Sequence, residues 1–361
     1  MRVSIDGLAS LYAAVARAHG ADEDEAGLFS AGLLQADLRG HHTQGIGLLP
    51  YLDTLYEAGT MHFGRPLTVL NESVATAALD GHGGSGHVIG ARAMEMAIAK
   101  AQAAGIGFVT VRGSGDYGMA SGYAMQALPH GMIGLSMSTG PLLVAPWGGR
   151  DAYFCTNPIA IAVPCGERDP IVIDMATSAG SMGNVVLAAR DGRRLGEKSV
   201  VDSAGVYTDD PLRVILNVMD RESRMSGALL PAGPKGFGMV LMVEMLSALL
   251  SGERNWQDER PADPTGRAAY YAQTFIAVSV SRFQPEAAFA AAAERMADTL
   301  TAARPAAGFT AVRLPGGAAA ATGRDYRANG IAVRAEEWAM VEALARRRDI
   351  ALPPDLYTDA P

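Results

Sequence analysis

The feature that most constrains the fold is an alternation, in the middle of the chain, between short apolar runs and longer segments with helical periodicity. Residues 74–79 and 108–111 are short and apolar, as strands are, whereas His87–Ala104 has helical spacing and ends at Gly105. Such alternation is typical of α/β proteins, in which helices cover a sheet. We expect further elements here: extended chain over 132–137, at least two strands within 152–173, and helices over 119–128 and 182–190.

Both ends of the chain are predicted to be helical. Leu8–His19 carries apolar residues at helical spacing, and Asp22 is a plausible N-cap with Glu25 three residues on. Ile46–Ala58 and Ala335–Arg348 show the same periodicity. The other expected elements are helices over 22–38, 236–250 and 285–302, a strand over 274–280, and a flexible alanine- and glycine-rich loop over 317–321.

Composition argues against several classes of function. The 361 residues carry a formal net charge of −8 and no block of Lys or Arg, so the basic stripe of a nucleic-acid-binding surface is missing. The most apolar stretch, Phe237–Leu250, is too short to span a bilayer, and Met1–Gly7 has no signal-peptide pattern. Cys155 and Cys165 lack metal-type spacing and read as reduced, buried thiols. We expect a cytoplasmic protein without metal, membrane or nucleic-acid partners.

The pattern Gly-x-Gly-x-x-Gly occurs twice, each time between an apolar run and a predicted helix. That context fits a dinucleotide-binding turn, in which a helix N-terminus receives the pyrophosphate. The acidic residue expected about 20 residues on is missing, however, because the following strands end at Arg112 and near Ser138. With 42 glycines, chance matches are frequent, and we interpret both copies as ordinary turns. They comprise Gly81, Gly83 and Gly86, and Gly113, Gly115 and Gly118.

Several short motifs occur in a fixed order along the chain. They are Ala36–Gly40 leading into Gly45 and Tyr51, Arg112-x-Ser114 with Gly118, Ala145–Gly149, Thr156–Pro158, Asp174–Ser178, Gly205 with Asp209–Pro211, Lys235–Gly238 and Leu314–Gly316. As an ordered set they resemble the type 2 malate/L-lactate dehydrogenase family. That family includes ureidoglycolate and sulfolactate dehydrogenases, diketogulonate reductase and piperideine-carboxylate reductases.

The resemblance implies an α/β fold distinct from the Rossmann type. A large, mostly antiparallel sheet would hold NADH or NADPH, and both termini would build a helical domain. The implied division places residues 1–75 with 325–361 in the helical, substrate and dimer domain, and residues 76–324 in the NAD(P)-binding sheet domain. The resemblance also implies an obligate homodimer with its active site at the domain and subunit boundary.

The resemblance assigns cofactor contacts to segments whose chemistry suits them. Asp174–Ser178 lies between a strand and a helix, where N–H groups and hydroxyls fit phosphate or ribose, although Thr177 or Ser178 could equally be an N-cap. Lys235 beside Gly236 could reach a cofactor phosphate or remain solvated. The expected cofactor-binding residues are Ser138, Asp174, Met175, Ala176, Thr177, Ser178, Lys235, Gly236, Pro315 and Gly316.

The expected substrate-binding residues are Leu48, Tyr117, Thr156 and Asn157. Thr156 and Asn157 place polar groups in an apolar stretch, where a substrate or the nicotinamide amide could be the required partner; a turn is the alternative. Tyr117 could donate a proton, and a core or dimer-contact position is the alternative for this tyrosine.

The chain departs from the family at four polar positions. Gln44 stands where the family has the histidine of a serine–histidine–glycine run, and Leu48 stands where an arginine commonly holds the substrate carboxylate. Asp116 replaces a histidine often assigned as the general acid, and Pro234 replaces another histidine. Losing the arginine removes a charge-assisted contact of roughly 1.5–3 kcal/mol for a carboxylate substrate.

These departures bear on how the product receives its proton. Reducing a ketone creates an alkoxide, for which histidine is a suited donor because its pKa lies near neutrality. Glutamine cannot serve, and aspartate could only if burial raised its pKa. An imine can bind already protonated, and a carboxylate at Asp116 would stabilise that charge. The candidate catalytic residues are Asp116, Gln44, His42 and Thr43; His41 and His42 could instead be exposed loop residues.

We therefore expect an NAD(P)H-dependent oxidoreductase that transfers hydride to a C=O or C=N group of a small molecule. Its specificity should be atypical, for an imine or for a ketone without the usual carboxylate contact. A conventional malate- or lactate-like dehydrogenase is one alternative, and a catalytically lapsed binding or scaffold homologue is another. Retention of Asp174–Ser178 and Lys235 argues against the lapsed homologue.

Overall fold

The computed structural model describes residues 1–361 apart from 197, 215–225, 254–270, 354–355 and 357–361. Its centre is a seven-stranded sheet with the order β2-β3-β4-β11-β5-β6-β7. All neighbours in this sheet pair antiparallel except β3 and β4, which are parallel. The expected α/β class with a mostly antiparallel large sheet is confirmed. The strands are β2 (Thr68–Glu72), β3 (Thr76–Gly84), β4 (Ile106–Ser114), β5 (Met132–Ser138), β6 (Ile159–Val163), β7 (Ile171–Met175) and β11 (Tyr271–Ser279).

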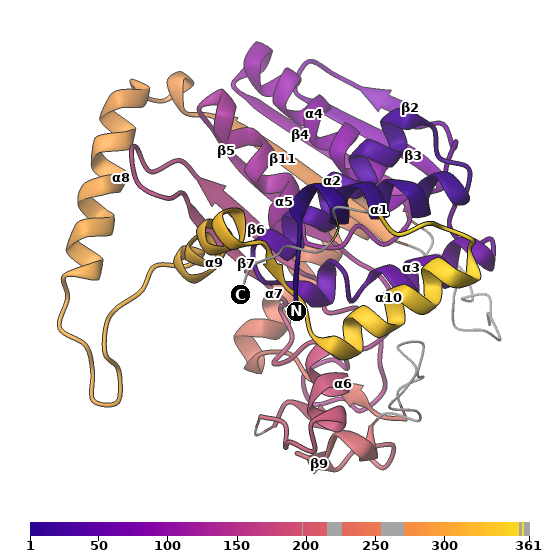
Figure 1. The fold of residues 1–361 in the computed structure, drawn as a ribbon. Coiled ribbons are helices and arrows are strands. Elements are labelled where there is room, and N and C mark those ends of the chain that lie inside the picture. The colour runs from indigo at the N-terminus through magenta and orange to yellow at the C-terminus, as the bar shows by residue number, and fades with distance from the viewer. Residues whose placement is uncertain (197, 215–225, 254–270, 354–355, 357–361) are drawn as a thin grey trace.

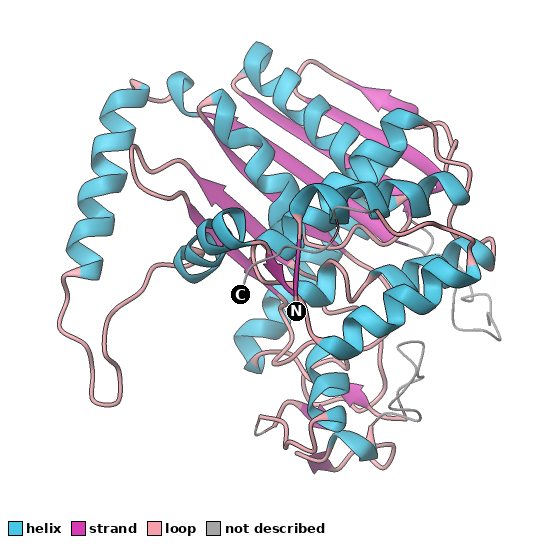
Figure 2. Cartoon of the chain, in the orientation of Figure 1, coloured by secondary structure: helices cyan, strands magenta, loops and turns pink. Residues whose placement is uncertain are grey.

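Helices cover the sheet and gather where the two ends of the chain meet (Figures 1 and 2). None of the described helices is long and apolar enough to cross a membrane. The helices are α1 (Ile5–Ala18), α2 (Glu23–Leu38), α3 (Leu49–Glu57), α4 (Gly86–Ala104), α5 (Ala120–Ala124), α6 (Met182–Arg190), α7 (Gly233–Glu244), α8 (Glu286–Thr301), α9 (Gly317–Asn329) and α10 (Ala335–Arg347). Shorter turns are η1 (His42–Gln44), η2 (Met125–His130), η3 (Pro211–Arg213), η6 (Val280–Arg282) and the π-helical η4 (Met245–Leu249).

Glycines in the strands let two helices pack directly on the sheet. The helix α4, which carries the chain from β3 to β4, ends at Gly105 in the left-handed conformation, with φ of 90°. A Cβ on Gly107 of β4 would stand only 1.9 Å from the carbonyl oxygen of Ala97 on α4. A Cβ on Gly134 of β5 would stand 2.0 Å from the carbonyl oxygen of Ala124 on α5. Any side chain at either strand position would push its helix away from the core.

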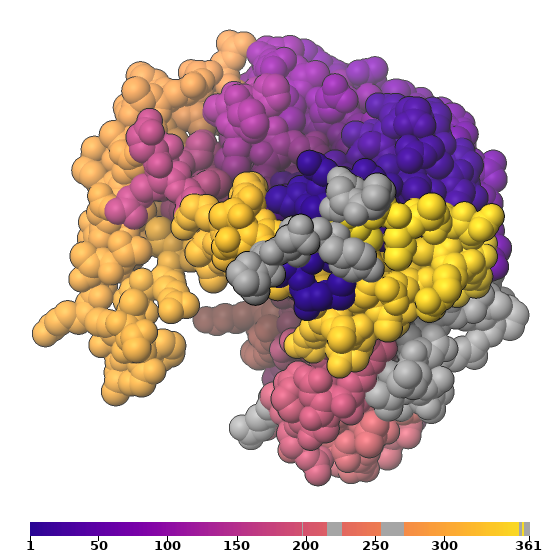
Figure 3. Space-filling view, in the orientation of Figure 1, coloured from indigo at the N-terminus to yellow at the C-terminus, as the bar shows by residue number. Residues whose placement is uncertain are grey.

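The two ends of the chain pack against each other. Strand β1 (Arg2–Val3) pairs antiparallel with β12 (Ile331–Ala332). One apolar cluster combines residues of α1, α2 and α3, such as Leu11 and Phe29, with Trp338 and Leu344 of α10. Figure 3 shows the yellow C-terminal residues lying over the indigo N-terminal ones. The division into residues 1–75 with 325–361 and residues 76–324 stays a prediction.

A smaller lobe projects beyond the sheet, at the bottom of Figure 1. Its three-stranded sheet has the order β10-β8-β9, with α6 beside it. A separate apolar cluster, which includes Val144, Val185, Leu229 and Val240, joins the lobe to α7. The strands are β8 (Val200–Val201), β9 (Tyr207–Thr208) and β10 (Ala228–Leu229).

The prediction of a flexible loop over 317–321 is wrong, because α9 begins at Gly317. Gly316 turns the chain with φ of 83°, and the alanines that follow have the highest helix propensity of any residue. Two other predicted helices are divided: 119–128 becomes α5 and η2, and 236–250 becomes α7 and η4. Strand β2 was not predicted, because all its residues are exposed and it lacks apolar alternation.

Candidate functional site

The turn between β4 and α5 holds Asp116, the residue expected to take part in proton chemistry. Its side chain is half-buried and is held at both oxygens. The backbone N–H of Gly118 donates to Oδ1 at 2.9 Å, and the Tyr271 hydroxyl donates to Oδ2 at 3.4 Å. Both donors stabilise the ionised form of the carboxyl group. The geometry therefore suits a carboxylate that faces positive charge better than a carboxylic acid that gives up a proton.

Two residues of β11 that the sequence analysis did not single out, Tyr271 and Gln273, hold this turn in place. The side chain of Gln273 is fully buried. Its amide donates to the carbonyl oxygen of Gly115 at 3.0 Å and accepts from the Ser114 hydroxyl at 3.0 Å. The available signal was a polar residue inside the apolar run 271–279, because a buried polar side chain needs a partner.

The two glycine-rich segments meet each other beside this turn. A Cβ on Gly86 would stand 2.2 Å from the carbonyl oxygen of Gly115. A Cβ on Gly81 would stand 3.0 Å from the carbonyl oxygen of Gly113. The glycines thus allow the ends of two parallel strands and the start of α4 to approach backbone to backbone. This close packing supports their interpretation as structural turns.

The segment η1 lies against the Asp116 turn. The carbonyl oxygen of Gln44 is 3.5 Å from the position of a Cβ on Gly118, so Gln44 and Asp116 are near neighbours in the fold. Thr43 lies beside the start of α6, with its Cβ 3.7 Å from the position of a Cβ on Gly183. The structure therefore brings together the segments that carry the expected catalytic residues, and their catalytic functions remain predictions.

His42 belongs to a buried network around Asp37. Its Nδ1 lies 2.7 Å from the Asp37 carboxylate, and its Nε2 lies 3.3 Å from the Tyr326 hydroxyl. Asp37 is fully buried and also accepts from the Tyr12 hydroxyl at 2.5 Å and from the Ile46 N–H at 3.0 Å. Burial alone would lower the pKa of His42, but the hydrogen bond and charge of Asp37 raise it. These contacts occupy both ring nitrogens of His42.

Two further histidines near the site are neutral at physiological pH. His87 on α4 is fully buried, its ring lies against Gly118, and burial lowers its pKa to about 3. Burial also lowers the pKa of His41, although the charge of Asp174 acts in the opposite direction. A neutral imidazole that resists protonation is a poor general acid. Neither residue is therefore suited to replace the missing family histidine as a proton donor.

Leu48 and Tyr117 lie in apolar cores. Leu48 is buried in the cluster that the two chain ends form. Tyr117 stacks on Tyr123 with ring centroids 4.8 Å apart, and its hydroxyl accepts from Ser136 at 3.3 Å. Burial raises the pKa of Tyr117 beyond the usual range of tyrosine. A contact of either residue with substrate stays a prediction.

Some of the expected cofactor residues, among them Thr177 and Ser138, lie beside Asn157, an expected substrate-binding residue on the loop before β6. Asn157 is fully buried and has a left-handed φ of 39°. Its amide nitrogen donates to the Val240 carbonyl at 3.1 Å and to Glu244 at 2.9 Å. Its Oδ1 is buried without a hydrogen-bond partner in the part of the chain that the structure describes. Thr177 closes the loop, because its N–H donates to the Thr156 carbonyl at 2.9 Å.

Helix α7 begins directly over the turn after β7. A Cβ on Gly236 would stand 2.9 Å from the carbonyl oxygen of Thr177, so glycine permits this approach. Lys235 precedes Gly236 in the first turn of α7 and is exposed. Ser178 is buried, and its hydroxyl donates to the Gly180 carbonyl at 2.6 Å. Three segments far apart in sequence thus pack against one another.

Other expected cofactor residues lie along β7 and at the end of β5. The Asp174 carboxylate accepts from the Ser121 N–H at 2.8 Å and so satisfies a free donor at the start of α5. Met175 is exposed and Ala176 is half-buried. Pro315 and Gly316 run beside β7, where the Pro315 carbonyl accepts from the Val172 N–H at 3.3 Å. The Ser138 N–H donates to the Pro158 carbonyl at 3.3 Å, which ties β5 to the Asn157 loop.

The Asp116 turn and the loop that carries Asn157 are joined through Gly140, Tyr271 and Cys155. A Cβ on Gly140 would stand 2.8 Å from the Tyr271 ring and 3.1 Å from the Cys155 sulfur. Cys155 precedes Thr156, whose binding of substrate stays a prediction, as does that of Asn157, and Tyr271 contacts Asp116. A bound molecule that reaches both segments would therefore be held between a carboxylate and the Asn157 loop.

The fold and the site define the class of the protein as an α/β oxidoreductase of the dehydrogenase and reductase kind. The chain belongs to the malate/L-lactate dehydrogenase family, which it matches over residues 3–342. The family resemblance drawn from the short motifs is thereby confirmed.

Named relatives span two kinds of chemistry. L-sulfolactate dehydrogenase of Methanocaldococcus jannaschii is 33% identical over 303 residues, 84% of each chain. A Δ1-pyrroline-2-carboxylate/Δ1-piperideine-2-carboxylate reductase of Pseudomonas putida is 32% identical over 289 residues, 79% of this chain and 82% of the relative. Among solved structures, sulfolactate dehydrogenase from M. jannaschii matches with a TM-score of 0.85 at 28% identity, covering 98% of both chains. The Δ1-piperideine-2-carboxylate reductase from Pseudomonas syringae matches with a TM-score of 0.83 at 28% identity, covering 96% of this chain and 100% of that one.

Proposed function

We propose that this oxidoreductase uses NADH or NADPH to reduce a C=N group in a small, cationic substrate. The observation that carries the proposal is the Asp116 carboxylate, held by two hydrogen-bond donors where the family has a histidine. A carboxylate in this state attracts a protonated imine and is poorly suited to protonate an alkoxide. The relatives that reduce Δ1-pyrroline-2-carboxylate and Δ1-piperideine-2-carboxylate support this direction.

The residues around the Asn157 loop fit a nicotinamide cofactor. The buried Oδ1 of Asn157 is an acceptor that a carboxamide N–H could satisfy. Lys235 places an exposed cation at the start of α7, where it would contact a phosphate. The cofactor, when bound, supplies the hydride. Cys155 and Tyr271, which lie on either side of Gly140, would line the site of the ring, and Asp116 would face the charge of the substrate.

The choice of substrate should follow from two features of the site: the carboxylate of Asp116, and Leu48 in the place of an arginine. Leu48 is buried and stands where the family commonly has the arginine that binds a substrate carboxylate. The loss of roughly 1.5–3 kcal/mol for such a contact favours substrates that bind without it. A cyclic imine without a carboxylate, such as 1-pyrroline, satisfies both conditions. It is cationic when protonated and has an apolar ring.

Steady-state assays at saturating NADH and NADPH test the proposal. We expect turnover of 1-pyrroline, weaker turnover of Δ1-piperideine-2-carboxylate because it carries a carboxylate, and little turnover of pyruvate or oxaloacetate. Robust reduction of either 2-oxo acid would overturn the preference for C=N and favour the conventional alternative, to which the sulfolactate and malate dehydrogenases among the relatives point. Failure to bind either cofactor, measured by its fluorescence, would favour a catalytically lapsed homologue.

We also propose that the protein acts as a homodimer. Three apolar side chains at and just after η4, Met245, Leu249 and Leu250, are each about half exposed, and a second copy could cover them. Light scattering coupled to size-exclusion chromatography should give about twice the chain mass. A monomer at micromolar concentration would overturn this proposal.

A further inference from the structure

Tyr271 links three elements at the heart of the site. It lies at the start of β11 and is only 6% exposed. Its hydroxyl is 3.4 Å from Oδ2 of Asp116 and also hydrogen-bonds with the side chain of Tyr51 on α3. A line of polar groups therefore runs from α3 through β11 to the turn after β4.

The backbone and the packing fix the direction of the Tyr271 side chain. Tyr271 pairs with Ser114 across β4, and an irregularity in the register follows before Gln273. Such irregularities re-aim side chains at the ends of strands. Gly140 and Cys155 then confine the ring from the side. The hydroxyl is thus presented to Asp116 by covalent geometry and close packing.

The Tyr271 hydroxyl has one proton, and both Oδ2 of Asp116 and the Tyr51 side chain lie within hydrogen-bond reach of it. Burial raises the pKa of Tyr271, and the charge of Asp116 together with the Tyr51 hydrogen bond raises it further. The phenol therefore keeps its proton throughout the physiological range. With the Gly118 N–H 2.9 Å from Oδ1 and the Tyr271 hydroxyl 3.4 Å from Oδ2, each carboxylate oxygen has a donor within hydrogen-bond distance. Donors on both oxygens favour the ionised form.

We propose that Tyr271 is a positioning residue that keeps Asp116 ionised and directed toward a cationic substrate. This inference rests on the proposed function, because the charge of Asp116 matters only if a cation binds beside it. Hydride adds to the carbon of a protonated C=N bond, the π electrons move to nitrogen, and a neutral amine results. Asp116 donates no proton in this step, so its ionised form is the useful one.

Several other titratable groups feel the charge of Asp116. Each stays neutral below about pH 9, because burial raises its pKa; that of Cys155 rises to about 11. A carboxyl titration in the acid range therefore reports on Asp116. These groups are Tyr56 on α3, Tyr117 in the same turn, Tyr123 on α5, Cys155 before β6 and Tyr271 on β11.

The test is the titration of Asp116 in the full-length protein. Aspartate side-chain carboxyl carbons are labelled with ¹³C, and the Asp116 signal is assigned by its loss in Asp116→Asn. In Tyr271→Phe we expect the midpoint to rise by about one pH unit, a tenfold change in proton affinity. The acid limb of kcat/KM for 1-pyrroline should move by the same amount, with NADH affinity changed less than about twofold.

Tyr123→Phe is the matched control, because its hydroxyl is also buried and donates to the Tyr117 carbonyl at 2.6 Å. A merely structural hydroxyl would lower the melting temperature and leave the midpoint unchanged. An unchanged Asp116 midpoint in Tyr271→Phe, or an equal displacement in Tyr123→Phe, would overturn the inference. Failure of the proposed function looks different: the wild-type protein would bind neither cofactor or reduce no imine, whatever the titration shows.

Discussion

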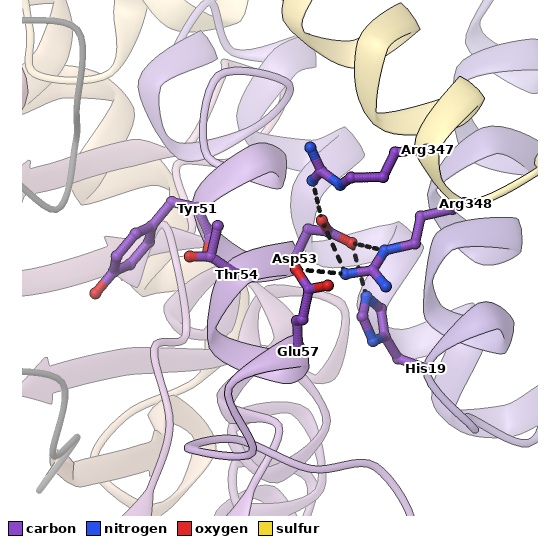
Figure 4. A network of polar contacts seen from close by, with 7 residues as sticks. All are labelled: His19, Tyr51, Asp53, Thr54, Glu57, Arg347 and Arg348. Carbon is purple, nitrogen blue, oxygen red and sulfur yellow. Dashed lines mark hydrogen bonds and ion pairs between the residues drawn. The ribbon is translucent and has the colours of Figure 1, made fainter. Parts of the chain in front are cut away.

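Two carboxylates near helix α3 are held in opposite ways. Asp53, on α3 itself, is fully buried and contacts His19 and two arginines. His19 Nε2 and Arg348 Nε each lie 2.8 Å from its Oδ1, and Arg347 contacts its Oδ2 (Figure 4). Asp116 is instead held by a backbone N–H and a phenol.

The difference separates a structural ion-pair network at Asp53 from the proposed reactive group at Asp116. Burial alone would raise the pKa of Asp53, but hydrogen bonds from His19, Arg348 and Arg347 lower it far below the usual range. The guanidinium groups of Arg347 and Arg348 cancel its charge, and the three contacts tie α3 to the ends of α1 and α10. The donors that hold Asp116 are neutral, so they orient the carboxylate without cancelling its charge. Figure 4 shows that Tyr51, on the same helix as Asp53, points away from the Asp53 network.

The same substitution at the two carboxylates should therefore give opposite phenotypes. Asp116→Asn keeps the size of the side chain and removes its charge. We expect kcat/KM for a cyclic imine to fall at least about 100-fold, because the attraction to the cation is lost. NADH affinity and melting temperature should change little. If Asp116→Asn reduced the imine at the wild-type rate, Asp116 would have no role in turnover, and the contrast with Asp53 would be wrong.

Asp53→Asn should leave catalysis intact and weaken the fold. Removing one partner of a buried ion pair costs about 3–5 kcal/mol, and we expect nearer 2–3 kcal/mol here because the Arg347 side chain is half exposed and screened. Urea unfolding followed by circular dichroism measures the change, and kcat at 25 °C serves as the control. If Asp53→Asn were as stable as the wild type, the Asp53 network would not be what stabilises the packing of α3 against α1 and α10.

The pH dependence of the free energy of unfolding at acid pH should further distinguish Asp53 from Asp116. The pKa of Asp53 is lowered on folding, so its contribution is fully present above the unfolded pKa of about 3.9 and is lost as pH falls below that value. The free energy of unfolding of the wild type should therefore drop on acidification more steeply than that of Asp53→Asn. Urea titrations at several pH values from about 5 down to about 2 measure both slopes. Parallel slopes would contradict the lowered pKa.

How far the sequence could predict each region depends on how local its causes are. The helix over 87–104 and its end at Gly105 follow from periodicity and a C-terminal glycine, which neighbouring residues decide. The mistaken loop over 317–321 arose because glycine and alanine were weighed by composition. The left-handed Gly316 and a run of strong helix formers actually decide that segment.

The site was harder to predict, because its contacts cross the sheet. Gln44 and Asp116 could be paired only through their family positions, since no local pattern joins them. Tyr271 and Gln273 reach the Asp116 turn because β11 lies between β4 and β5, an order that follows a long crossover in the chain. Sequence periodicity carries no information on that order. A polar residue in a buried strand was the one available hint.

A third carboxylate, Asp37, is fully buried like Asp53 but contacts a histidine and a tyrosine rather than arginines. The prediction that concerns it has the smallest expected effect. Asp37 holds the η1 segment through His42, whose pKa is raised in the fold by the Asp37 hydrogen bond and charge, against the opposing effect of burial. A raised pKa means that the contribution of His42 is fully present below the unfolded value of about 6.5 and is lost as pH rises through the folded pKa. The free energy of unfolding should therefore decline from pH 6 toward pH 8.

His42→Gln should flatten this decline, and His130→Gln is the matched control because His130 is exposed on η2. Urea unfolding across this pH range measures both variants against the wild type. If His42→Gln kept the full decline, His42 would not be the proton-binding partner of Asp37. If it abolished turnover while leaving the pH dependence of stability unchanged, His42 would belong with Asp116 as a reactive group rather than with Asp53 as a structural one.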